Sequence, residues 1–264
     1  TVNRGIIMEN KISENVEDLL AASQIYQFLS TCLLEPNKEA VDLFNNKEYM
    51  DEVKSCLGQH GNGELSETFS KLQEGLKNAD IETLTQGYRD TFGGATVAMD
   101  CPPYEMYYSG SQIWQQTQDL ADISGTYKAY GIEIEKNSTT SRWDHVAVEL
   151  EFLHFLTYKL AYAIENGSTE EQESCLSAKK KFLHAHIGRW IKAFSVSVIK
   201  KTPEDFYRQA ATLATTFIHI EMVKLAVDAE EIDEYMGNEP DYLQRLEGKS
   251  AMACDSCMDE EKYD

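Results

Sequence analysis

Apolar residues recur three and four positions apart along most of this 264-residue chain. That spacing places them on one face of an α-helix, whereas a half-buried β-strand needs apolar and polar residues in alternation. We find no alternating segment, and prolines and glycines divide the helical pattern into about nine or ten pieces. The sequence therefore predicts an all-α fold, an irregular bundle of about nine or ten helices around one core.

The apolar pattern and its breaks give approximate bounds for these helices. Asp80, Asp144 and Thr202-Pro203 are placed as helix starts, and Thr169 with Gln172 matches a capping box. The glycine-rich run 58–63 is expected to be a loop, with His60 solvated. The expected helices span residues 13–34, 39–46, 49–57, 65–76, 81–92, 112–131, 144–167, 169 to at least 194, and 205 to at least 220.

Most of the chain is expected to form one helical domain, followed by a charged end. Residues 10–228 carry the helical pattern, and the two halves of this domain meet at the loop 131–143. From Asp228 onward there are thirteen acidic against three basic residues. Residues 229–264 are therefore predicted to be an acidic C-terminal tail, ordered only in part.

The overall charge restricts the possible partners. Forty-five Asp and Glu residues against 24 Lys and Arg give a net charge of −21. Such a chain is unsuited to nucleic acid or to an anionic membrane, and it favours cationic partners. No apolar run has the length of a membrane span, and no secretory signal pattern opens the sequence, so we expect a cytoplasmic protein without stable membrane insertion.

The junction 130–156 holds the densest set of residues that could do more than fill a core. Gly131 is expected to end one helix, and Asp144 to cap the next. His145 and Glu149 continue the apolar stripe of that helix, so two ionisable groups point inward. Glu149 then needs a partner, either His145 or a backbone N–H. These residues form either a cap with a satisfied buried pair or a binding site.

An irregular aromatic segment precedes this junction. Pro102 and Pro103 exclude regular helix, and the tyrosines that follow place amphipathic rings on a loop: Tyr104, Tyr107 and Tyr108. Such a loop forms either a binding surface or an aromatic lid over the core. His186 and Trp190 lie one helical turn apart and belong either to the core or to a groove.

Metal-ligand patterns are present but incomplete. Glu151 and His154 form the Glu-x-x-His pair of di-iron helical bundles, but a second such pair does not occur. Cys254 and Cys257 form either half of a zinc or cluster site or a disordered thiol pair. Phosphate-loop and dinucleotide motifs are absent from the sequence, and we expect no metal and no cofactor.

Five segments resemble one known family when taken together in their order and spacing: CPPYEMYYSG, YKAYG, WDHVAVELEF, FLHAHIGRW and TPEDFYR. They resemble the TorD/DmsD/NarJ-type family of redox-enzyme maturation chaperones over residues 10–228. The resemblance implies a TorD-like helical fold in the cytoplasm. It also implies binding of the twin-arginine signal peptide of a molybdenum-containing oxidoreductase subunit, whose export is delayed until its cofactor is inserted.

The resemblance also implies where the peptide binds. The family's proline-aromatic motif, helix-ending glycine, Asp-His pair and His-x-x-x-Trp element fall on Tyr104, Glu105, Tyr108, Gly131, Asp144, His145, His186 and Trp190. Two positions depart from the pattern. Arg142 and Trp143 stand where the family often has a proline before the Asp-His pair, and Arg189 replaces the proline before Trp190.

The physical chemistry of a twin-arginine leader agrees with these positions. Two guanidinium groups and an apolar stretch require carboxylates beside a desolvated aromatic surface, and Glu105, Asp144 and Glu149 could supply the carboxylates. We therefore expect a non-catalytic chaperone, monomeric or homodimeric, that binds the signal peptide and the apo form of its client enzyme. The alternatives are a helical metalloprotein or enzyme using His145, Glu149, Glu151 and His154, and a signalling adaptor for another basic peptide.

Overall fold

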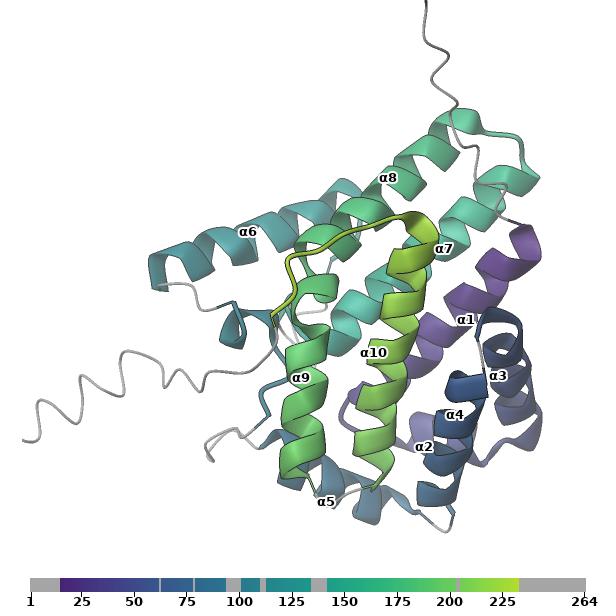
Figure 1. The fold of residues 1–264 in the computed structure, drawn as a ribbon, viewed down its shortest axis with the longest axis vertical. Coiled ribbons are helices and arrows are strands. Elements are labelled where there is room, and N and C mark those ends of the chain that lie inside the picture. The colour runs from purple at the N-terminus through teal and green to yellow at the C-terminus, as the bar shows by residue number, and fades with distance from the viewer. Residues whose placement is uncertain are drawn as a thin grey trace, which may run out of the picture.

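The computed structural model describes residues 15–61, 63–77, 79–93, 101–109, 113–133, 142–202 and 205–232. Within these ranges the chain forms ten α-helices, one 3-10 helix and no β-strand, which confirms the predicted all-α bundle (Figure 1). None of the described helices is long and apolar enough to cross a membrane. The helices are α1 (Val16–Leu33), α2 (Lys38–Asn45), α3 (Lys47–His60), α4 (Gly63–Gly75), α5 (Ile81–Phe92), α6 (Ile113–Ala129), α7 (Val146–Glu165), α8 (Thr169–Ala185), α9 (Ile187–Lys201) and α10 (Asp205–Leu225), with η1 (Glu105–Tyr107) between α5 and α6.

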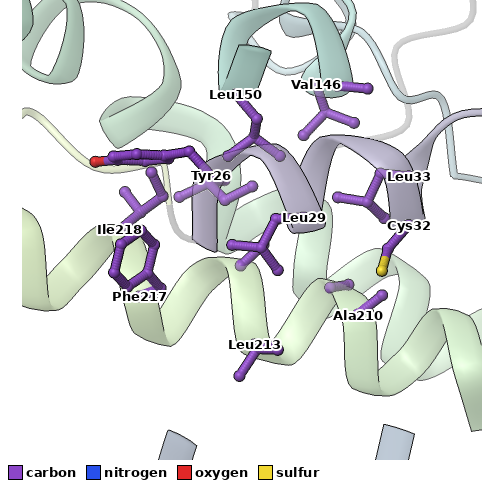
Figure 2. Packing of buried hydrophobic residues seen from close by; sticks show 14 of the residues in the cluster. Tyr26, Leu29, Cys32, Leu33, Val146, Leu150, Ala210, Leu213, Phe217 and Ile218 are labelled. Atoms are coloured by element: carbon purple, nitrogen blue, oxygen red, sulfur yellow. The ribbon is translucent and has the colours of Figure 1, made fainter. Parts of the chain in front are cut away.

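Helix α1 packs between α7 and α10 (Figure 2). It runs antiparallel to α7, since Ser23 bonds to His154 and Ser30 donates to the carbonyl oxygen of Ala147 at 2.8 Å. Because α1 has neighbours on two sides, it is apolar around most of its circumference. The N-terminal helix is thus packed within the C-terminal half. The boundaries of the predicted domain and tail remain predictions.

Helix starts follow the expected capping chemistry in several places but not everywhere. Asp80 accepts the Thr83 N–H at 2.8 Å, as predicted. The capping box at Thr169 is wrong, because Thr169 is already the first residue of α8 and Ser168 precedes it. Pro203 lies outside the described residues.

The predicted helix from residue 169 through 194 is broken at His186, which is a correction to the sequence analysis. His186 has φ −121° and ψ −110°, so α8 ends there and α9 begins in a new direction. Gly188 permits this close turn, since a β-carbon there would overlap the carbonyl oxygen of Leu183. The turn lays α9 beside α10 (Figure 1).

A buried charged cluster joins three helices on the inner side of α10. The Lys179 ammonium lies 2.6 Å from one carboxylate oxygen of Glu221, and His60 lies 3.5 Å from the other. His60 is therefore a buried residue at the end of α3, and its prediction as a solvated loop residue is wrong. Burial alone would raise the pKa of Glu221, but the Lys179 charge and the contact with His60 outweigh it and lower that pKa to about 2.

The chain continues past α10 along α9. Ile232 donates its N–H to the carbonyl oxygen of Arg189 at 2.7 Å, and Lys192 lies 3.3 Å from Glu231. The first residues of the predicted acidic tail are therefore packed on the bundle. Cys254 and Cys257 lie outside the described residues.

The Lys179–Glu221 pair yields a test of stability. We expect Lys179→Met to lower the free energy of unfolding by about 3–5 kcal/mol at neutral pH, because it leaves a buried carboxylate without its cation. Urea titration measures this loss. The double variant Lys179→Met/Glu221→Leu should recover most of the stability, since it removes both charges.

The pH dependence provides a second measurement on the same pair. A carboxyl whose pKa is lowered by folding stabilises the protein above its unfolded pKa of about 4.3, and this contribution disappears as the pH falls through the folded pKa. The difference between parent and Lys179→Met should therefore narrow as the pH falls from about 4.3 towards about 2. A single variant as stable as the parent at pH 7 would contradict this interpretation.

Candidate functional site

The aromatic segment and the junction, which the sequence analysis treated separately, lie against each other. Val146 donates its N–H to the carbonyl oxygen of Pro103 at 2.9 Å, and Glu105 donates its N–H to that of Asp144, also at 2.9 Å. Tyr104 and His145 face each other in an isolated antiparallel bridge. Two segments that are about forty residues apart in sequence are thus held together by backbone hydrogen bonds.

Asp144 lies inside this contact and does not cap α7, so its prediction as a helix cap is wrong. Its side chain is fully buried and accepts the N–H of Met106 at 3.3 Å. Arg142 meets the same carboxylate with two bonds, from Nε to Oδ1 at 2.9 Å and from Nη2 to Oδ2 at 2.7 Å. This two-pronged geometry is the strongest form of guanidinium–carboxylate contact.

Aromatic rings complete the surroundings of the Arg142 guanidinium. Its central carbon lies 4.2 Å from the ring centre of Tyr104 and 5.7 Å from that of Tyr107. The side chain of Arg142 is 37% exposed while that of Asp144 is 0% exposed, so the guanidinium covers the carboxylate from the solvent side. From the sequence, Arg142 was recognised only as a departure from a family pattern, and Tyr107 was not among the predicted site residues.

His145 is the residue that caps α7. Its Nδ1 accepts the N–H of Ala147 at 3.1 Å, and its Nε2 lies 3.5 Å from the hydroxyl of Tyr88. Burial, with a contribution from the Arg142 charge, lowers the pKa of His145 to about 3. The ring is therefore neutral at physiological pH, with its proton on Nε2.

Glu149 bonds to Trp190 instead of His145. The Trp190 indole N–H donates to Oε2 at 3.2 Å, and no described residue bonds to Oε1. Burial raises the pKa of Glu149 well above its usual value, and the nearby Glu105 and Asp144 charges add to the rise. Trp190 in turn stacks on Tyr108, with ring centres 5.3 Å apart.

His186 connects the break between α8 and α9 to the same network. Its Nδ1 lies 3.2 Å from a carboxylate oxygen of the buried Glu105, and its Nε2 lies 3.8 Å from Asp122 on α6. Gly131 has φ +73° just beyond α6, so it ends that helix as predicted. It makes no side-chain contact, and α6 is tied to the junction by the Tyr127 hydroxyl, which donates to the carbonyl oxygen of Trp143 at 3.2 Å.

The structure therefore connects eight of the nine predicted site residues, but most of them are buried. The predicted residues that form the network are Tyr104, Glu105, Tyr108, Asp144, His145, Glu149, His186 and Trp190. Only Tyr104 among them is partly exposed, together with Tyr107 and Arg142. The network supports a small surface that consists of these three side chains above Asp144.

The residues of the alternative metal hypothesis do not converge. Glu151 is exposed on α7, whereas His154 points to Ser23 on α1, with Nδ1 2.8 Å from the serine oxygen. Among the described residues, no group of three His, Cys, Asp or Glu side chains is arranged to hold a metal ion. The geometry gives this alternative no support.

The raised pKa of Glu149 predicts a specific pH dependence. A carboxyl whose pKa is raised by folding stabilises the protein only below its unfolded pKa of about 4.3, and this contribution is lost as the pH rises towards the folded value. Glu149→Gln resembles the neutral acid, so its stability relative to the parent should increase as the pH rises from 5 to 8. Thermal melts measure this gain, with Glu151→Gln as an exposed control on the same helix. A constant difference in stability across this range would contradict a raised pKa of Glu149.

Similar proteins extend over most of the chain. It is 26% identical over 222 residues to the perchlorate reductase assembly chaperone protein of Dechloromonas aromatica (strain RCB), covering 81% of this chain and 94% of that protein. It is also 26% identical over 212 residues to the chaperone protein TorD of Aliivibrio fischeri (strain ATCC 700601 / ES114), covering 77% and 94%. A solved structure from Archaeoglobus fulgidus, provisionally described as a redox enzyme maturation protein, covers 75% of this chain and 93% of its own at 18% identity and a TM-score of 0.41.

A family model described as nitrate reductase delta subunit matches residues 59–196. This match includes more than half of the chain and every predicted site residue. It agrees with the family that the sequence motifs indicated. The chain belongs to the nitrate reductase delta subunit family, the TorD/NarJ family of the sequence analysis.

Proposed function

We propose that this chain is a cytoplasmic, non-catalytic chaperone for a molybdenum-containing oxidoreductase. It binds the twin-arginine signal peptide of the catalytic subunit, together with the apo form of that subunit, until the cofactor is inserted. Membership of the family supports the proposal, as do two relatives that are themselves named as chaperones.

One observation carries the peptide-binding part of this proposal. The fully buried Asp144 carboxylate, with the Tyr104 ring beside it, holds a guanidinium by two hydrogen bonds and a ring contact. A planar guanidinium fits both features, whereas a lysine ammonium matches neither the paired bonds nor the stacking. The site has the chemistry that an arginine-containing peptide requires.

The other predicted site residues act in this proposal by holding the surface in place. His145 caps α7 and touches the Tyr104 ring, and His186 holds Glu105. The Glu149–Trp190 contact and the stacking of Trp190 on Tyr108 fix the segment from behind. Gly131 allows α6 to end beside the junction. These side chains are positioning groups for the Asp144 site.

The charge of the chain assists the first encounter with such a peptide. A net charge of −21 attracts a basic leader over a distance set by ionic strength. It also disfavours nucleic acid as a partner. The protein acts as a monomer or homodimer in this proposal.

Asp144→Asn tests the binding site directly. We expect affinity for a paired-arginine leader peptide to fall about tenfold or more, because a charge-assisted contact contributes about 1.5–3 kcal/mol. Helix content should be unchanged, since His145 caps α7. Calorimetric titration measures affinity, and Asp51→Asn on the exposed face of α3 is the matched control. Parent-like affinity in a folded Asp144→Asn would show that the peptide binds elsewhere.

The kinetics of peptide binding should depend on salt in a particular way. Long-range attraction is screened by ions, whereas apolar contacts in the complex are not. Raising the ionic strength should therefore slow association more than it speeds dissociation. Stopped-flow mixing gives both rates, and association that is insensitive to salt would exclude electrostatic steering.

A further inference from the structure

The guanidinium that occupies the candidate site belongs to this chain. Arg142 is two residues from Asp144 and fills the space between that carboxylate and the Tyr104 and Tyr107 rings. We propose that Asp144, Tyr104 and Tyr107 form a guanidinium-binding site. Arg142 occupies this site in the free protein and leaves it when another guanidinium enters. The identity of the incoming group rests on the proposed function: it is an arginine of the leader peptide.

The position of Arg142 allows it to leave without rearranging the bundle. It precedes the first residue of α7, Val146, and is not part of a helix. Among the described residues, its guanidinium contacts Asp144, Tyr104 and Tyr107, while its side chain is already 37% exposed. Rotation of this one side chain would open the carboxylate towards solvent and leave both rings in place.

Asp144 explains why an exchange is favoured over simple departure. A fully buried carboxylate without a cation is strongly unfavourable. Among the described residues, the Asp144 carboxylate accepts hydrogen bonds from Arg142 and from the Met106 N–H. An arginine from outside can provide the same two bonds and the same ring contacts. The free energy of replacing one guanidinium by the other is then close to zero, so the remaining contacts of the peptide decide whether it displaces Arg142.

This arrangement accounts for selection of a peptide over a single arginine. A tethered side chain competes at an effective concentration of about millimolar or above, so free arginine at lower concentration competes poorly with it. A peptide with a second arginine and an apolar stretch adds contacts that Arg142 lacks. With Arg142 in place, the apparent affinity equals the intrinsic affinity multiplied by the fraction of time for which the site is open.

Arg142→Ala tests the exchange by calorimetric titration with a paired-arginine leader peptide. If Arg142 occupies the site for more than about nine-tenths of the time, its removal should strengthen binding about tenfold or more. A paired-lysine version of the peptide should gain much less affinity, because a lysine lacks the planar guanidinium group. Equal or weaker binding of the paired-arginine peptide to folded Arg142→Ala would overturn the proposal, since it would make Arg142 a support for the peptide and not its competitor.

Thermal melts with ethylguanidinium test this proposal separately from the proposed function. They also test it if Arg142→Ala folds poorly. At non-denaturing concentration, ethylguanidinium should raise the melting temperature of Arg142→Ala more than ethylammonium does, and should have no such effect on the parent or on Arg142→Ala/Asp144→Asn. If this rescue occurs but no peptide binds any variant, the guanidinium site stands and the proposed function fails. If the parent binds the peptide but neither rescue nor gain in affinity occurs, the exchange is wrong and the proposed function stands.

Discussion

The burial of Asp144 is the constraint on which the candidate site depends. A carboxylate with no exposed surface requires both hydrogen-bond donors and a cation. Met106 provides a backbone N–H from the aromatic segment, and Arg142 provides the guanidinium from the junction. Because these partners come from two distant parts of the sequence, satisfying one charge brings the two segments together and places the Tyr104 ring against the guanidinium.

Other buried ionisable groups surround the Arg142–Asp144 pair. Three carboxyl groups share the network, and burial with mutual repulsion raises the pKa of Glu149, which favours its neutral form. His145 is neutral as well, and Glu105 is bonded to His186. In the Arg142–Asp144 pair, by contrast, the carboxylate is buried and the guanidinium is partly exposed. The Lys179–Glu221 pair differs because both groups are buried, which suits a role in stability.

The sequence was sufficient to predict most of the helices but only part of the site. Local signals such as the Asp80 cap depend on residues three positions apart and are readable from the sequence. The break at His186 was missed because the apolar period continues through it, and the turn is set by close packing. His145 replaces Asp144 as the cap for a similar reason, since Asp144 is drawn to partners distant in sequence. The role of Arg142 could not be predicted from the sequence, because it depends on which aromatic rings lie beside the side chain.

Localising the bound peptide tests the central claim most directly. A leader peptide carrying a photoreactive group next to its arginine pair can be cross-linked to the full chain and the attachment points mapped by mass spectrometry. The account predicts attachment within residues 101–109 and 142–146, where the Asp144 site and its rings lie. Attachment confined to other surfaces, such as α3 and α4 on the opposite part of the bundle (Figure 1), would contradict it.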